Sequence, residues 1–138
     1  MTLRSFVVLV LAFEAVAFAQ KTPSDPANIL GTWQGTSTCT DRIAAPACND
    51  EVVIYDFRPG PKPGVIRWLA DKVVAGTRQP MGELEVAWDR EQSCWKAEVS
   101  SPSGKTVWKL FVDGTHLTGT GQRMPSGGVI RRIDAKKQ

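Results

Sequence analysis

Apolar and polar side chains alternate in three runs within LEVAWDREQSCWKAEVSSPSGKTVWKLFVDG, residues 84–114. In the first run Leu84, Val86 and Trp88 alternate with acidic residues such as Glu83 and Glu85. The second and third runs repeat the pattern with Trp95, Ala97, Val99, and with Trp108, Leu110, Val112. A period of two is that of a β-strand with one buried face, so this stretch predicts three neighbouring strands.

Turn signals divide the rest of the chain into further short strands. Asp113-Gly114 is a strong hairpin signal, and the proline- and glycine-rich stretch Arg58 to Gly64 must be a loop. We expect strands at residues 31–39, 51–57, 65–70, 72–77 (ending near Pro80), 84–89, 95–99, 108–112, 117–122 and 129–133. Eight or nine short strands joined by tight turns favour an all-β fold. We therefore predict one antiparallel up-and-down β-barrel of about eight strands, because closure removes exposed sheet edges.

The N-terminus has the pattern of a secretory signal peptide. A short start with one positive charge, Arg4, precedes the apolar run Phe6 to Phe18, and Ala17-Phe18-Ala19 forms a small-x-small cleavage site. Glu14 is the one departure from this pattern. The run is shorter than the roughly 20 residues that span a bilayer. We predict a signal peptide at residues 1–19, export to the periplasm or beyond, and no membrane span in the mature chain.

Composition limits what the mature chain can be. We expect a flexible mature N-terminus at residues 20–29 and a single barrel domain at residues 30–138.

The whole chain has 17 basic and 14 acidic residues, a net charge of +3. These charges are interspersed, whereas nucleic-acid binding needs a clustered basic stripe, so we expect no nucleic-acid partner.

The three cysteines predict a disulfide, because an exported chain meets oxidising conditions. Cys39 and Cys48 enclose a short loop, and we favour this pair over pairings that use Cys94. The remaining thiol is then either buried or bridges a dimer. Cys94 precedes Trp95, so regular alternation points its thiol outward, where another segment covers it or a partner meets it.

Gly31-Thr32-Trp33 opens the first strand, and Arg131-Arg132 lies in the last. These residues resemble the G-x-W opening and the last-strand arginine of the calycin superfamily, the lipocalin-like barrels. The resemblance implies that Trp33 closes one end of the barrel and that an arginine, for which we favour Arg131, packs across its ring. Such a cation–π contact would join the first strand to the last.

Tryptophans supply the best candidate binding surface. Trp88, Trp95 and Trp108 fall on the inferred apolar face, where they either line a pocket for a small hydrophobic ligand or fill the core. Trp68 can face either side.

The residue types that usually act in catalysis or metal binding are better explained in this sequence by surface or structural positions. His116 follows a turn and should be exposed without a nucleophile nearby. The carboxylate pairs Asp50/Glu51 and Asp89/Glu91 read as solvated surface. The remaining candidates match no nucleophile elbow or phosphate loop: Ser37, Ser93, Gly119, Gly121, Gly127 and Gly128. We expect no catalytic residue, no metal site and no cofactor.

Three functions remain, in order of preference. The first is a binding protein for a small hydrophobic ligand. The second is a protein-interaction module, such as a protease or lysozyme inhibitor, that acts through the loop Thr40 to Asn49 with Arg58 to Gly64 as its neighbour. The third is an enzyme that uses a barrel pocket. The oligomeric state is left open.

Overall fold

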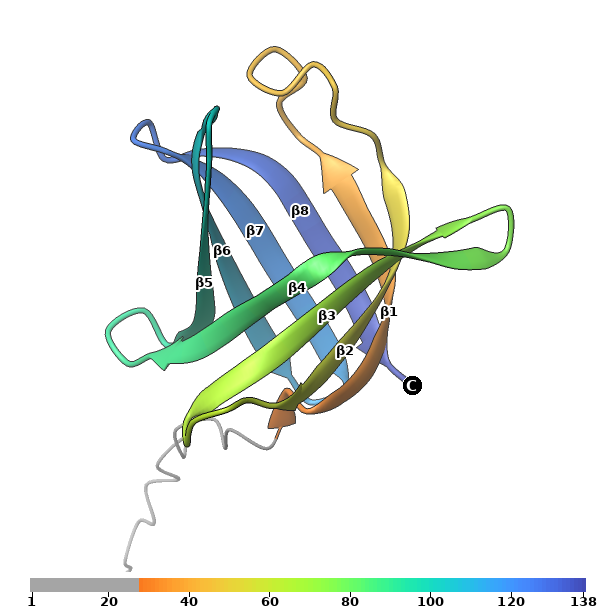
Figure 1. The fold of residues 1–138 in the computed structure, drawn as a ribbon, viewed down its shortest axis with the longest axis vertical. Helices are drawn as coiled ribbons and strands as arrows, with labels where there is room; N and C mark the ends of the chain where they lie inside the picture. The colour runs from red at the N-terminus through yellow and green to blue at the C-terminus, as the bar shows by residue number, and fades with distance from the viewer. Residues whose placement is uncertain (1–27) are drawn as a thin grey trace, which may run out of the picture.

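The computed structural model describes residues 28–138 as a closed barrel in which each strand pairs antiparallel with its chain neighbours (Figure 1). The strands are β1 (Gly31–Cys39), β2 (Glu51–Pro59), β3 (Val65–Val74), β4 (Thr77–Asp89), β5 (Cys94–Ser101), β6 (Gly104–Asp113), β7 (His116–Met124) and β8 (Gly128–Lys137). The all-β up-and-down barrel is confirmed. The predicted signal peptide, and residues 20–27 of the predicted flexible segment, lie outside the described residues. Within residues 28–138, no helix is long and apolar enough to cross a membrane.

The strand break expected near Pro80 is wrong. β4 continues through Pro80, and the two strands predicted at 65–70 and 72–77 belong to β3 and to the start of β4. A turn at Ala75 and Gly76, both with positive φ, joins β3 to β4. The β3–β4 register shifts between Ala70 and Asp71, which leaves Met81 as an extra residue in β4. Proline is tolerated here because its missing N–H faces no partner strand. The resulting hairpin projects past the barrel (Figure 1).

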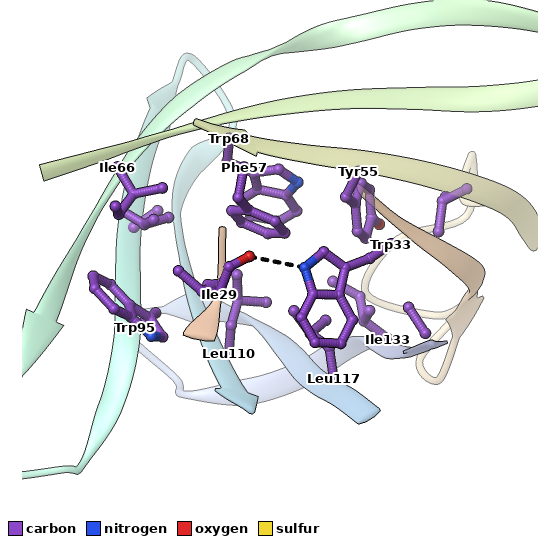
Figure 2. Close-up of a cluster of buried hydrophobic side chains, with 14 residues drawn as sticks. Ile29, Trp33, Tyr55, Phe57, Ile66, Trp68, Trp95, Leu110, Leu117 and Ile133 are labelled. Carbon is purple, nitrogen blue, oxygen red and sulfur yellow. Dashed lines mark hydrogen bonds between the residues drawn. The ribbon is translucent and has the colours of Figure 1, made fainter. Parts of the chain in front are cut away.

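The core fills the end of the barrel around Trp33 (Figure 2). The Trp33 side chain is fully buried, and its Nε1–H donates to the carbonyl of Ile29 at 2.8 Å. The other buried members are Val53, Tyr55, Phe57, Ile66, Trp68, Val86, Trp95, Ala97, Leu110, Leu117, Ile133 and Ala135. This packing makes the Trp33 end the closed end of the barrel.

The cation over Trp33 is a lysine, so the expected arginine contact is wrong. Lys137 Nζ lies 5.3 Å from the centre of the Trp33 ring, and Trp33 pairs with Lys137 in the β1–β8 ladder. Arg131 pairs with Cys39 at the opposite end of β1, and Arg132 points outward. The stagger between β1 and β8, which the sequence does not reveal, decides which basic residue reaches the indole.

β1 and β8 join over seven consecutive pairs, from Trp33–Lys137 to Cys39–Arg131. Gly35 permits a close approach at the centre of this join, because a Cβ there would collide with the Asp134 carbonyl. β4 and β5 differ: they pair only at Ala87–Lys96, Trp88–Trp95 and Asp89–Cys94. Beyond these pairs residues 77–86 and 97–101 diverge, and we call the space between them the β4–β5 gap (Figure 1).

The cysteines pair as predicted, with a disulfide between Cys39 and Cys48. The remaining thiol, Cys94, was expected to be either buried or available to bridge a dimer. It is fully buried, and a partner therefore cannot reach it. Burial raises the pKa of the Cys94 thiol, and the nearby Asp89 carboxylate acts in the same direction.

Candidate ligand-binding site

A cavity of about 360 Å³ lies at the end of the barrel opposite Trp33. Six strands contribute to its walls: Ser37 (β1), Glu51 and Tyr55 (β2), Trp68 and Ala70 (β3), Met81, Gly82, Glu83 and Leu84 (β4), Trp108 (β6) and Arg131 (β8). This volume falls at the lower end of the roughly 300–1,000 Å³ range of small-molecule sites. The barrel is therefore packed at one end and hollow at the other.

Aromatic side chains form one wall of this cavity. Trp68 is 5.0 Å from Tyr55 and 5.6 Å from Trp108 between ring centres, and both pairs are edge-to-face. Phe57 stacks on Trp68 from the core side at 5.7 Å. Gly121 makes room for Trp108, because a Cβ there would lie 2.9 Å from the indole ring. Edge-to-face packing fixes the orientation of these rings relative to one another.

The buried Nε1–H of Trp68 has no hydrogen-bond acceptor among the described residues. A buried donor without a partner costs roughly 1–3 kcal/mol, and most are paired in folded proteins. The Nε1–H of Trp95, in the packed core, is likewise buried without an acceptor in the described part of the chain, so an unpaired indole donor is not particular to the cavity wall.

Arg131 supplies the polar side of the cavity. Its guanidinium donates to Ser37 Oγ at 2.8 Å and to the Asn49 carbonyl at 2.8 Å, and lies 3.5 Å from Glu51. The Arg131 and Glu51 side chains are only 15% and 18% exposed. Three fixed contacts hold the guanidinium in one orientation across the β1–β8 join.

Burial raises the pKa of the Tyr55 phenol to about 12. Ser37 and Arg131 act against this shift, and the Glu51 carboxylate adds to it. Tyr55 is therefore a neutral hydroxyl throughout the physiological pH range. It gives the cavity wall a polar atom without a charge.

The three tryptophans predicted to line a pocket do not gather in one place. Trp108 lines the cavity, whereas Trp88 and Trp95 pack on each other edge-to-face at 5.4 Å outside it. Trp95 is fully buried in the core and Trp88 is half-buried. Trp68, whose side the sequence left open, takes the central position. The register that places Trp68 opposite Phe57 decides this, and alternation within one strand does not reveal it.

The other candidates have structural roles or lie on the surface. His116 is exposed as expected, and its Nε2 lies 3.0 Å from the Asp134 carboxylate. Asp50 accepts the Cys39 N–H at 2.8 Å, and Asp89 accepts the Gln92 N–H at 2.9 Å. Within residues 28–138, no group of three or more His, Cys, Asp or Glu side chains is placed to hold a metal ion.

The disulfide loop from Thr40 to Asn49 is exposed, and its Ile43 side chain is 97% exposed. The expectation that Arg58 to Gly64 lies beside it is wrong, because successive connections of an up-and-down barrel alternate between its two ends. Its neighbours are instead Ser103, Arg123 and Ile130, across a hollow of about 420 Å³.

No family model, no curated protein and no solved structure matches this chain.

Proposed function

We propose that this chain is an exported, calycin-like barrel that binds a small hydrophobic ligand in the cavity at its open end. The observation that carries the proposal is the hollow half of the barrel, about 360 Å³ with an ordered aromatic wall. A barrel that serves only as a scaffold has no reason to leave such a space unfilled, because voids weaken a core. The Cys39–Cys48 disulfide supports an oxidising location outside the cytoplasm.

The walls indicate the chemistry of the ligand. Trp68, Trp108 and Tyr55 favour a flat apolar or aromatic group. Fixed polar groups are few: the Tyr55 hydroxyl and the Arg131–Glu51 pair. A ligand with one apolar body and one or two polar substituents matches this arrangement.

Tryptophan fluorescence tests this proposal, with fatty acids, retinoids and aromatic metabolites as probes. We expect saturable quenching or a blue shift. Trp108→Phe should reduce this response, because Trp108 is one of the two tryptophans, with Trp68, that line the cavity. Trp88→Phe is the matched control, since Trp88 is also half-buried but lies outside the cavity. Equal loss in both variants, or a flat response to every probe, would reject the proposal.

One observation favours protein interaction through the disulfide loop as a second candidate function. Ile43 is a large apolar side chain exposed on a loop that the Cys39–Cys48 disulfide and the Arg42–Asp50 ion pair hold in shape. Rigid loops of this kind suit inhibitors, because little ordering entropy is lost on binding. If the chain inhibits a protease or a lysozyme, Ile43→Ser should abolish the inhibition and leave the fluorescence response to small ligands unchanged.

A further inference from the structure

The β4–β5 gap exposes main-chain hydrogen-bonding groups. The ladder between the two strands ends at Ala87 and Lys96, although β4 extends ten residues before Ala87 and β5 extends to Ser101. Unpaired strand edges attract other extended chains, and proteins normally cover or interrupt them. This edge is instead left open beside a cavity.

The ladder alternation shows which groups of β4 face the gap. The N–H of Val65 donates to Lys62 and its carbonyl accepts from Gly60, so both point away from β4. Ala87 lies opposite Val65, and its own N–H and C=O therefore point toward Lys96 on β5. Because direction alternates along a strand, the main-chain groups of Glu83 and Glu85 also face the β5 side, where no strand pairs with them.

Pro80 ends this edge. Beyond Glu83, the next residue whose main-chain groups should face β5 is Pro80, because the extra residue Met81 shifts the alternation by one. Proline has no N–H and therefore cannot donate from this position. The available edge is therefore short and defined, with two donors and two acceptors from Glu83 and Glu85. By the same alternation, Glu98 and Ser100 of β5 form the facing side of the gap.

The gap also lies beside the cavity. Residues Met81 to Leu84 of β4 line the cavity, and so does Trp108 of β6, but β5 between these strands contributes no lining residue. Leu84 and Val99 are half-buried on the two sides of the gap. A chain lying along β4 therefore has its inward side chains directed at the aromatic wall.

We propose that the open edge of β4 binds an extended peptide segment of a partner protein, which places one large apolar side chain in the cavity. The main-chain bonds form with Glu83 and Glu85, and the anchor packs against Trp68 and Trp108. This inference rests on the proposed function, since it uses the same cavity, and it names the ligand as a side chain on a strand. Strand addition of this type obtains affinity from main-chain bonds and specificity from pockets.

The acidic side chains at the β4 edge indicate which kind of peptide it favours. The outward side chains of this edge are Glu83, which pairs with Arg67, and Glu85, which lies opposite Arg67 in the β3–β4 ladder but beyond ion-pair distance. The two carboxylates thus share one arginine. A basic residue opposite Glu85 is favoured, because opposite charges stabilise cross-strand pairs. A second copy of this chain is disfavoured, since antiparallel pairing of two β4 edges would set Glu83 and Glu85 against the same acidic residues.

The test uses the acetylated, amidated peptide Lys-Val-Lys-Phe-Lys-Val-Lys, whose inward side is apolar and whose outward side is basic. In amide NMR spectra of the full mature chain, we expect it to shift the resonances of Glu83, Glu85 and Trp108. The same peptide N-methylated at its lysines cannot donate to β4 and should bind at least about tenfold more weakly. Glu85→Lys should weaken binding of the unmodified peptide, and Glu91→Lys, at an exposed turn position, should not.

The outcomes separate this inference from the proposed function. N-acetylphenylalaninamide, the anchor alone, tests the cavity. If it shifts Trp108 but the peptide binds no more tightly than its N-methylated form, the cavity binds ligands and strand addition is wrong. Peptide shifts confined to the disulfide loop, or β4 shifts that depend only on protein concentration, would also overturn the inference, the latter in favour of a dimer. Absence of any shift with either probe contradicts both proposals.

Discussion

Two joins of the barrel differ in a way that sequence distance does not predict. β1 and β8 lie at opposite ends of the described chain, yet they pair over seven positions, with Lys137 over Trp33 at one end and Arg131 bonded to Ser37 at the other. β4 and β5 are joined by one short turn, yet they pair over three positions and then diverge. Loop closure makes the first join the costlier one to form. The longer ladder is therefore found where the two strands farthest apart in the described chain meet.

The difference between the two joins matches the proposed division of the molecule into a stable end and a binding end. The β1–β8 join runs from the packed end at Trp33 to the cavity wall at Ser37 and Arg131, whereas the β4–β5 ladder stops and its gap opens beside the hollow end. Binding sites usually occur where local stability is low, because ligands need access.

The largest effect is expected from Trp33→Ala, which removes the side chain that closes the barrel. It leaves a buried cavity, frees the Ile29 carbonyl and removes the Lys137 contact. Such truncations cost about 3–5 kcal/mol in free energy of unfolding, measurable by urea denaturation. The matched variant Trp88→Ala, at the β4–β5 join, removes a half-buried ring and should cost clearly less. Equal losses would mean that the two joins contribute equally.

A smaller effect is expected from raising the pH, because Tyr55 lies in the cavity wall. Its pKa is raised to about 12, so the folded state keeps a proton that the unfolded chain loses near pH 10. This contribution to stability is complete below pH 10 and is lost as the pH rises through 12, with about 1 kcal/mol gone by pH 11. Tyr55 is the only tyrosine, so phenolate absorbance reports it alone. A midpoint near 10 in the folded protein would mean that water fills the cavity around the phenol.

Strand periodicity revealed the architecture because the barrel buries one face of each strand. The alternation from Leu84 to Val112 and the Asp113-Gly114 turn correspond to β4 through β6 and the turn into β7. The Cys39–Cys48 pair followed from its short loop. These features are local, so a single sequence contains them.

The site depends on register and stagger, which a single strand does not reveal. Stagger brings Lys137 to Trp33 instead of Arg131, and register brings Trp68 to Trp108 while Trp95 stays in the core. Pro80 looked like the end of a strand, because the bulge at Met81 and the missing β5 partner are visible only in three dimensions.

Hydrogen exchange of individual amides, followed by NMR, tests the contrast between the two joins most directly. The account predicts fast exchange at Glu83, Glu85, Glu98 and Ser100. It predicts slow exchange at Leu84 and Val86, which pair with β3, at Ala87 and Lys96, and along β1 from Gly35 to Ser37. Protection at Glu85 and Glu98 equal to that at Ala87 and Lys96 would show that β4 and β5 pair along their length, and the β4–β5 gap would not exist in solution.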